Sequence, residues 1–329
     1  MSKQQGELNL QQFKGQIAVI TGAGNNGIGW GIAKHAALEL GMHVVLVDLH
    51  LSVVEAACEK LRELAHDQQV IGVQCDVTKI EELEKVVQVV DEKMADHPIG
   101  MVFANAGVIF NSTILKSSLE DWEITLNVNV LGVVATAKVF VPLLQRQTTQ
   151  SVFCTTASVG GLVRGDGGAA SYQASKHAVV ALSESLSFEI AKKSPQIRVC
   201  VLCPCIVTSS LMASSLVNKK ASKDASQIEV EQLHPASSAF AMTPENHAKQ
   251  VFDLLKEGKF YLVTDNVKPY VEHDYPFEAK NIIRERFQNL EDLELDNSDA
   301  FDERAQGHPT SILKGAMFKE IRRLNESEG

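Results

Sequence analysis

The sequence predicts a doubly wound α/β domain, in which helices cover both faces of a parallel sheet, followed by a helical C-terminal extension. Short apolar segments alternate with longer amphipathic segments over most of the chain, which is the pattern of strands joined by crossover helices. A glycine-rich turn also follows the first apolar segment directly, as expected of a strand–turn–helix unit. The chain has 329 residues, of which 45% are hydrophobic, so it can bury a large core.

The predicted strands and helices alternate over most of the chain. We expect strands at residues 16–21, 44–47, 70–75, 100–104, 151–155, 197–202 and 260–264. We expect helices at residues 30–40, 52–65, 80–94, 118–145 and 171–192, and a further helix that starts at residues 243–245 with a proline at its first position. Since the strands are separated by helices, they are expected to be parallel.

The last part of the chain departs from this alternation. Residues 211–242 are rich in Ser, Ala and Lys without a clear period, which indicates a loop or short helices. Farther on we expect helices at 277–290 and 312–324, with an acidic linker at 291–303. We therefore divide the chain into a domain at residues 1–265 and an extension at residues 266–329. The extension is expected to pack on the domain or on a neighbouring subunit, and whether it covers the substrate mouth stays open.

Charge and composition argue against several classes of partner. The net charge of −10 repels nucleic acids and anionic membranes. No apolar segment is expected to span a bilayer, and residues 1–13 have no apolar signal core. Cys203 and Cys205 have neither redox-pair nor zinc spacing, so no metal is expected. Three other cysteines lie in predicted strands, and this usage indicates a reducing, cytoplasmic compartment.

Polar or turn-forming residues come at or just after the ends of five predicted strands. They are Asp48, Asp76, Asn105, Ser158 and Pro204. Because ligands of doubly wound sheets bind beyond the carboxyl ends of the strands, these residues are expected to surround a single site.

The glycine-rich turn at Gly22, Gly27 and Gly29 suits a nucleotide. Glycine allows a tight turn and lets a pyrophosphate approach the backbone. The N-terminus of the following helix supplies N–H groups and the positive end of its dipole. A tight turn with a purely structural purpose is the alternative.

Tyr172 and Lys176 lie four residues apart in a predicted helix, so their side chains share one face. An ammonium beside a phenol favours the phenolate and lowers its pKa. The pair could then exchange a proton with an alcohol or a ketone near neutral pH. The alternative is a surface helix on which the tyrosine packs against the lysine stem.

These residues also form a set of ordered motifs. Thr21-Gly22 and Gly27-Ile28-Gly29 are followed by Asn105-Ala106-Gly107, Asn129, Ser158, Tyr172-x-x-x-Lys176 and Pro204. In this order and spacing they resemble the short-chain dehydrogenase/reductase family, over residues 12–265. The resemblance implies a Rossmann-type sheet and an oxidoreductase that uses a nicotinamide cofactor.

The resemblance implies roles for four side chains. Tyr172 would be the general acid/base, and Lys176 would hold the nicotinamide ribose and lower the pKa of the tyrosine. Ser158 would hydrogen-bond the substrate oxygen. Asn129 would support a proton-relay water, with Asn127 as the alternative for that role.

The resemblance also implies a set of cofactor-binding residues. They are Gly22, Asn26, Gly27, Ile28, Gly29, Asp48, Asp76, Val77, Asn105, Ala106, Gly107, Tyr172, Lys176, Pro204, Val207 and Ser209. Asp48 would accept hydrogen bonds from the adenosine ribose hydroxyls and repel a 2′-phosphate, so NAD is expected over NADP. A protonated His50 would soften that repulsion.

The chain departs from the family pattern at two places. Four residues separate Gly22 from Gly27, where the common pattern has three. Pro204 is followed by Cys205, where the family usually has glycine.

Together these observations predict an NAD-dependent oxidoreductase that acts on a secondary alcohol or ketone. Two alternatives stay open: a regulator that binds NAD(H) without turnover, and an epimerase or dehydratase that uses NAD transiently. The substrate pocket is expected to be partly apolar and lined by Phe110, Leu162, Val163, Leu211, Met212 and residues 213–242. Arg164 would bind an anion or lie exposed. The helices at 118–145 and 171–192 are apolar on more than one face, so a homodimer or homotetramer is expected.

Overall fold

The computed structural model describes residues 6–24, 26–163, 168–191, 193–211, 215 and 241–264. All of the predicted strands lie within these residues, and their observed bounds differ from the predicted ones by no more than two residues at either end. The predicted extension at 266–329, including the two helices predicted for it, lies outside the described residues, as does most of the segment 211–242.

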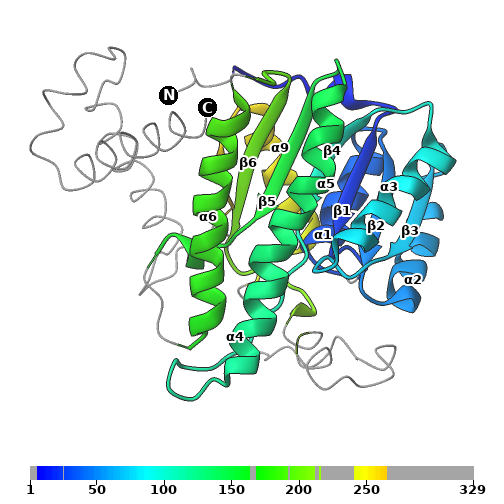
Figure 1. Ribbon diagram of the computed structural model, residues 1–329. Coiled ribbons are helices and arrows are strands. Elements are labelled where there is room, and N and C mark those ends of the chain that lie inside the picture. The colour runs from blue at the N-terminus through cyan, green and yellow to red at the C-terminus, as the bar shows by residue number, and fades with distance from the viewer. Residues whose placement is uncertain are drawn as a thin grey trace, which may run out of the picture. The chain divides into compact units, whose positions relative to one another are not determined.

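The sheet has seven strands in the order β3-β2-β1-β4-β5-β6-β7, and neighbouring strands are parallel (Figure 1). The strands are β1 Ile17–Thr21, β2 His43–Asp48, β3 Val70–Gln74, β4 Ile99–Ala104, β5 Ser151–Thr156, β6 Ile197–Pro204 and β7 Tyr261–Thr264. The predicted doubly wound parallel sheet is therefore confirmed. The strand order reverses between β1 and β4, and the carboxyl ends at such a switch point form the usual ligand site.

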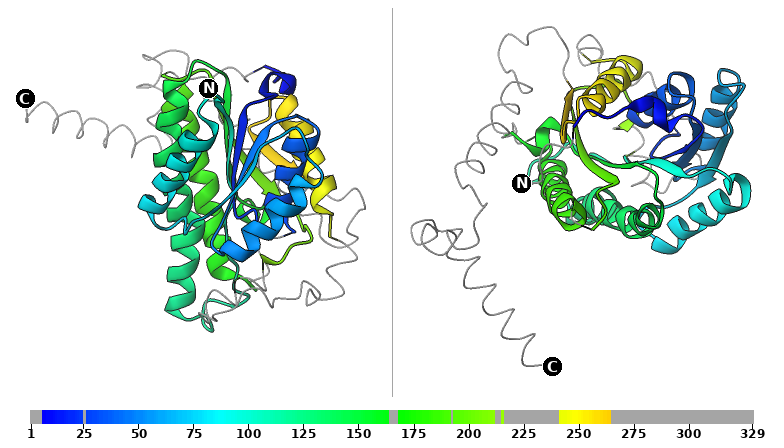
Figure 2. Two further views of the ribbon diagram at one scale, coloured as in Figure 1. Left: turned by 90° about the vertical axis from the view of Figure 1, so that its right-hand side faces the viewer. Right: turned by 90° about the horizontal axis from the view of Figure 1, so that it is seen from above.

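Helices cover both faces of the sheet, as Figure 2 shows most clearly in the view from above. One face carries α1 (Ile28–Leu38), α2 (Leu51–Arg62) and α9 (Pro244–Lys256), with α1 packed against α9. The other face carries α3 (Ile80–Met94), α5 (Gly132–Arg146) and α6 (Ala170–Ala191), with α3 packed against α5. Both faces are thus shielded from water, as the apolar strands require.

The core is built from side chains on both faces of the central strands. Strands β1, β4, β5 and β6 are buried along their whole length. The largest fully buried side chains include Phe13, Phe103, Phe140, Phe153 and Phe252. Burial on both faces explains why these strands are continuous apolar runs in the sequence rather than alternating ones.

The predicted helix at 118–145 contains a π-helical turn. Its first part is α4 (Leu119–Leu126), which starts at a capping box between Ser118 and Asp121. Residues Asn127–Leu131 are π-helical, and α5 follows directly. A π turn takes backbone groups out of the regular hydrogen-bond ladder and is frequent at functional sites.

This long helical segment also meets the length and composition of a membrane span. Among the residues that the structure describes, Leu119–Arg146 is one helical stretch of 28 residues that could cross a membrane by length and composition. The expectation that no segment meets that criterion was wrong. The α5 part packs on β4, β5 and α3, and a helix that covers a sheet is apolar for that reason alone.

His247 is a titratable side chain that is fully buried. It lies on α9, which packs against α1 and β7, and it is 0% exposed. Neither ring nitrogen has a hydrogen-bond partner within the described ranges. Burial lowers the pKa of His247 from 6.5 to about 4 because it disfavours the imidazolium.

We expect His247 to make the fold sensitive to acid. The imidazole has a pKa of 6.5 when exposed and about 4 in the fold. Folding therefore carries no penalty from His247 above pH 6.5, where the ring is neutral in both states. As the pH falls from 6.5 to about 4, the unfolded state gains a proton that the folded state does not, and stability is lost. At about 1.4 kcal/mol for each pKa unit, the loss reaches about 3 kcal/mol. Urea unfolding of a His247→Phe variant at several pH values should show a correspondingly flatter acid dependence. A His66→Asn variant, altered at an exposed position, is the control, and equal acid dependence in both variants would disprove the assignment.

Candidate active site

Asn105 ties together the carboxyl ends of three strands. Its Nδ2 donates to the carbonyl oxygens of Thr21 at 3.0 Å and Gly22 at 3.2 Å, and its Oδ1 accepts from Thr156 Oγ1 at 3.1 Å. The Oγ1 of Thr21 in turn accepts the backbone N–H groups of Asn105 at 2.9 Å and Ala106 at 3.0 Å. The Asn105 side chain is therefore engaged within the protein, where it braces the glycine turn.

The glycine turn after β1 needs glycine at two of its positions. Gly22 has a φ of 64°, which residues with a side chain rarely adopt. A Cβ at Gly29 would lie 2.6 Å from the Gly22 carbonyl oxygen, so α1 can approach the turn only without a side chain there. Gly27 is the N-cap of α1 and offers no side-chain acceptor. The turn, which includes Asn26 and leads into Ile28, therefore suits a phosphate at the N-terminus of α1.

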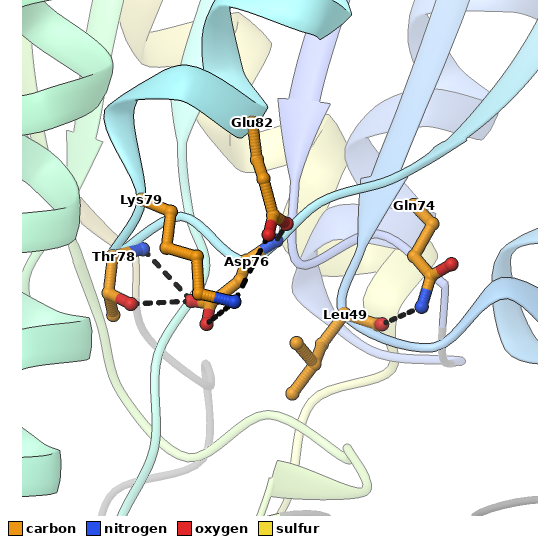
Figure 3. A network of polar contacts seen from close by, with 6 residues as sticks. All are labelled: Leu49, Gln74, Asp76, Thr78, Lys79 and Glu82. Atoms are coloured by element: carbon orange, nitrogen blue, oxygen red, sulfur yellow. Dashed lines mark hydrogen bonds and ion pairs between the residues drawn. The ribbon is translucent and has the colours of Figure 1, made fainter.

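Asp48 lies against the same turn. Its Oδ2 accepts the Gly24 N–H at 2.9 Å. Burial raises the pKa of Asp48, while the backbone N–H groups of Gly24, His50 and Leu49 oppose the rise. The end of β3 supports the loop that follows β2, because Gln74 Nε2 donates to the Leu49 carbonyl oxygen at 3.1 Å (Figure 3).

Asp76 is held in a polar network at the start of α3 (Figure 3). Its Oδ1 accepts from the Thr78 N–H at 3.0 Å and from Thr78 Oγ1 at 2.7 Å, and its Oδ2 lies 3.6 Å from Lys79 Nζ. Glu82 accepts the Asp76 N–H at 2.7 Å and pairs with Lys79 at 3.1 Å. These contacts fix the turn after β3, in which Val77 is buried.

Tyr172, in the first turn of α6, lies beside Ser158, which follows β5. Burial raises the pKa of the Tyr172 phenol above 10, and a hydrogen bond with Ser158 opposes the rise. Ser158 Oγ also accepts the Gly160 N–H at 3.1 Å and lies 3.5 Å from the carbonyl oxygen of Pro204. The sequence predicted that Lys176 would lower the pKa of the tyrosine. In the structure burial outweighs any such effect.

Lys176 is buried beside Tyr172 and close to the end of β5. Its Nζ donates to the carbonyl oxygen of Thr156 at 2.7 Å and lies 5.5 Å from the centre of the Tyr172 ring. Burial lowers the pKa of Lys176 from 10.5 to about 8. The side chain is thus charged at neutral pH but loses its proton only slightly above it. A Cβ at Gly107 would lie 3.5 Å from Nζ, which places the loop after β4 next to the ammonium.

Asn129, in the π turn, connects that loop to α6. Its Oδ1 accepts the Val108 N–H at 2.8 Å, and its Nδ2 donates to the Val108 carbonyl oxygen and to Ser175 Oγ, both at 2.9 Å. Ser175 Oγ donates to the Tyr172 carbonyl oxygen at 2.6 Å. Both N–H groups of the Asn129 amide are used within the protein, so a contact with a relay water cannot use them. Asn127, the alternative for that role, is exposed.

The segment after β6 runs past the glycine turn. A Cβ at Gly27 would lie 3.1 Å from the Cβ of Ser209. Val207 forms a β-bridge with Met242, held by the Thr208 N–H that donates to the Met242 carbonyl oxygen at 2.9 Å. The structure therefore brings the residues after β6 next to those after β1.

The residues predicted to line the substrate pocket are described only in part. Phe110, Leu162 and Val163 are buried, and Leu211 is half-buried. Met212, Arg164 and most of residues 213–242 lie outside the described residues. In the part of the chain that the structure describes, no group of three or more His, Cys, Asp or Glu side chains could hold a metal ion.

Sequence reasoning missed two supporting residues. Ser175 lies three residues after Tyr172, and this spacing on a helix could have indicated a contact with the same site. Thr156 binds Lys176 through its backbone carbonyl. Every residue type supplies a carbonyl, so no sequence signal could have identified that contact.

Comparisons with known proteins agree with this geometry. The family model for short chain dehydrogenases matches residues 16–221. The meso-2,3-butanediol dehydrogenase of Serratia marcescens is 33% identical over 200 residues, which cover 61% of this chain and 74% of that protein. 

Two solved structures are similar to the fold described above. A short chain dehydrogenase/reductase from Burkholderia phymatum in complex with NAD has a TM-score of 0.68 and 30% identity, covering 77% of this chain and 89% of that chain. An alcohol dehydrogenase from the archaeon Thermococcus sibiricus, complexed with 5-hydroxy-NADP, has a TM-score of 0.64 and 25% identity. The match covers 79% of this chain and 100% of that chain. Because the family model matches more than half of this chain, the chain belongs to the short-chain dehydrogenase/reductase family.

Proposed function

We propose that this protein is an NAD-dependent oxidoreductase that interconverts a secondary alcohol and a ketone, with Tyr172 as the general acid/base. The observation that carries the proposal is the proximity of a half-buried phenol, a buried ammonium and a serine hydroxyl at Tyr172, Lys176 and Ser158. These groups can supply the proton, the charge and the oxygen ligand that the reaction needs. The similarity to a butanediol dehydrogenase supports this substrate class.

The residues present fit a nicotinamide dinucleotide. The close approach of Gly29 to the turn and the N-terminus of α1 suit the pyrophosphate. The carboxylate of Asp48, beside Gly24, suits the hydroxyls of the adenosine ribose. The NAD and NADP-type ligands held by the two similar structures further support a nicotinamide cofactor.

Tyr172 and Ser158 act on the substrate oxygen. The nicotinamide, when bound, supplies the hydride acceptor or donor. In oxidation the Tyr172 phenolate takes the hydroxyl proton of the alcohol, and in reduction the neutral phenol returns a proton to the oxygen. Ser158 donates a hydrogen bond to the same oxygen and stabilises the charge that develops there. Because burial raises the pKa of Tyr172, the resting phenol is neutral and ready to donate.

Lys176 stabilises the phenolate once the proton has left. Its ammonium lies 5.5 Å from the centre of the Tyr172 ring, in surroundings that screen charge poorly. One N–H of the ammonium is used by Thr156, and an ammonium has three to give. The others suit the hydroxyls of the nicotinamide ribose.

Asn129 is a positioning residue in this proposal. Through Val108 and Ser175 it sets the spacing between the loop after β4 and the first turn of α6. That spacing determines where the Tyr172 phenol lies relative to Ser158.

Removal of the Tyr172 hydroxyl tests the proposal. Tyr172→Phe keeps the ring and loses the proton donor, so we expect turnover to fall by at least about 100-fold while NADH binding is retained. Turnover would be followed by NADH absorbance over a panel of secondary alcohols and ketones. Tyr261→Phe, which removes a phenol that contacts Glu184 instead, is the control.

The same panel separates the proposal from its alternatives. Near-wild-type turnover in Tyr172→Phe would remove Tyr172 from its role. Binding without turnover across the whole panel would favour a regulator, and conversion without net NADH formation would favour an epimerase or dehydratase.

Asp48 is expected to select NAD over NADP. A carboxylate beside the glycine turn accepts a hydrogen bond from a 2′-hydroxyl and repels a 2′-phosphate. We expect NAD to be preferred by at least about tenfold in kcat/KM, or about 1.4 kcal/mol. Asp48→Ser should narrow the ratio, mainly by improving NADP, whereas the exposed Asp67→Ser should leave it unchanged. Equal efficiencies with both cofactors in the unmodified protein would contradict this assignment.

We further propose that the face formed by α4, α5 and α6 pairs with a second copy of the chain. Leu131 in the π turn is 55% exposed, and Phe188 on α6 is 62% exposed. Leu119 and Leu126 on α4 are also exposed. Large apolar side chains along adjacent helices favour burial in a symmetric interface.

Sedimentation velocity tests this interface. We expect the protein to be a dimer or tetramer at micromolar concentration, and Phe188→Asp with Leu131→Asp to shift it toward the monomer because both place a charge in the interface. The exposed Lys85→Asp, on α3, is the control. A monomeric wild-type protein at that concentration would rule the interface out.

A further inference from the structure

Lys60, in the last turn of α2, reaches the glycine turn that follows β1. Its Nζ donates to Asn26 Oδ1 at 3.3 Å, across 34 residues of sequence. Asn26 immediately precedes Gly27, in a turn with one residue more than the common family pattern. The end of α2 is therefore tied to the part of the turn that departs from the pattern.

The indole ring of Trp30 fixes the position of Lys60. Nζ lies 5.0 Å from the centre of that ring, within the range of a cation–π contact. Trp30 is the third residue of α1 and is only 2% exposed, so its ring is held by the core. The ammonium is thus held between a fixed ring and the Asn26 carbonyl.

The charge of Lys60 also adds to the positive end of α1. The first turn of that helix carries a partial positive charge, and Gly27 offers no side chain to neutralise it. Glu245 on α9 carries a carboxylate close enough to Lys60 for an electrostatic interaction, but its direct partner is Lys34 at 3.2 Å. Lys60 therefore places a positive charge beside the glycine turn, where it contacts Asn26.

We propose that Lys60 is a positioning residue for the cofactor, which acts through Asn26 to hold the lengthened turn in the shape that accepts the pyrophosphate. An added residue gives a turn more conformations, and restricting them in advance lowers the entropy lost on binding. This inference rests on the proposed nicotinamide dinucleotide. It concerns cofactor affinity, since the contacts of Lys60 are with Asn26 and Trp30 and not with the residues proposed to act on the substrate.

Three variants test the inference. Lys60→Met keeps the aliphatic stem but removes the donor and the charge, and Asn26→Ala removes the acceptor. Lys85→Met removes a charge at an exposed position of α3 and is the matched control. By calorimetry we expect the Kd for NADH to rise about two- to fivefold in Lys60→Met and in Asn26→Ala, the factor that corresponds to one exposed cation contact. The double variant should bind no more weakly than either single one, because both remove the same contact.

The outcomes separate this inference from the proposed function. A wild-type protein that does not bind NADH would overturn both. Wild-type binding together with equal affinities of Lys60→Met and Lys85→Met would overturn this inference alone. Additive losses in the double variant would also overturn it, since Lys60 would then act on the phosphates without Asn26.

Tryptophan fluorescence gives a readout that needs no cofactor. The chain has two tryptophans, so in a Trp122→Phe background the emission reports on Trp30. We expect Lys60→Met to change that emission, because it removes the ammonium from the ring face, and Lys85→Met to leave it unchanged. An unchanged emission in Lys60→Met would overturn the contact on which the inference depends.

Discussion

The buried ammonium of Lys176 limits how the rest of the site can be arranged. Moving a charge out of water is costly unless it gains strong hydrogen bonds. Lys176 obtains one from the carbonyl oxygen of Thr156 at 2.7 Å. That carbonyl is positioned by β5, whose carboxyl end lies between β4 and β6, so the charge can be held only where the parallel sheet ends.

The neighbouring contacts keep a phenol aligned with this charge. Ser175 accepts a hydrogen bond from Asn129 and donates one to the backbone of Tyr172. Asn129 in turn holds the backbone of Val108, because its Oδ1 accepts the Val108 N–H and its Nδ2 donates to the Val108 carbonyl oxygen. A chain of short contacts thus runs from the loop after β4 to the first turn of α6. The π turn supplies the Asn129 side chain at the centre of this chain.

Much of the fold was predictable because its signals are local. Strands buried on both faces are continuous apolar runs, and the turn after β1 needs glycine at Gly22 and Gly29 for steric reasons. The ordered motifs grouped Ser158, Tyr172 and Lys176 in one candidate site, and in the structure Tyr172 lies beside both of the others. Local patterns therefore predicted the architecture, while the roles of the site residues stay a prediction.

The rest depends on contacts between distant segments. The π turn at Asn127–Leu131 carries Asn129, whose partners Val108 and Ser175 lie 21 and 46 residues away in the sequence, and no local pattern revealed it. The predicted lowering of the Tyr172 pKa considered the lysine charge but not the burial, which acts in the other direction. Lys60 reaches Asn26 across 34 residues. The contact is possible because α1 and α2 both pack on β2, and neither segment alone indicates this arrangement.

The pH dependence of ketone reduction with NADH tests this account most directly. Reduction needs a neutral Tyr172 and a charged Lys176, and burial keeps the pKa of the phenol above 10 while it lowers that of Lys176 to about 8. The account therefore predicts that kcat/KM is constant near neutral pH and falls with a midpoint near pH 8. A rate that stays constant to about pH 10 would contradict a role for a perturbed Lys176. A fall with a midpoint below about pH 7 would mean that the pKa of the phenol is lowered rather than raised.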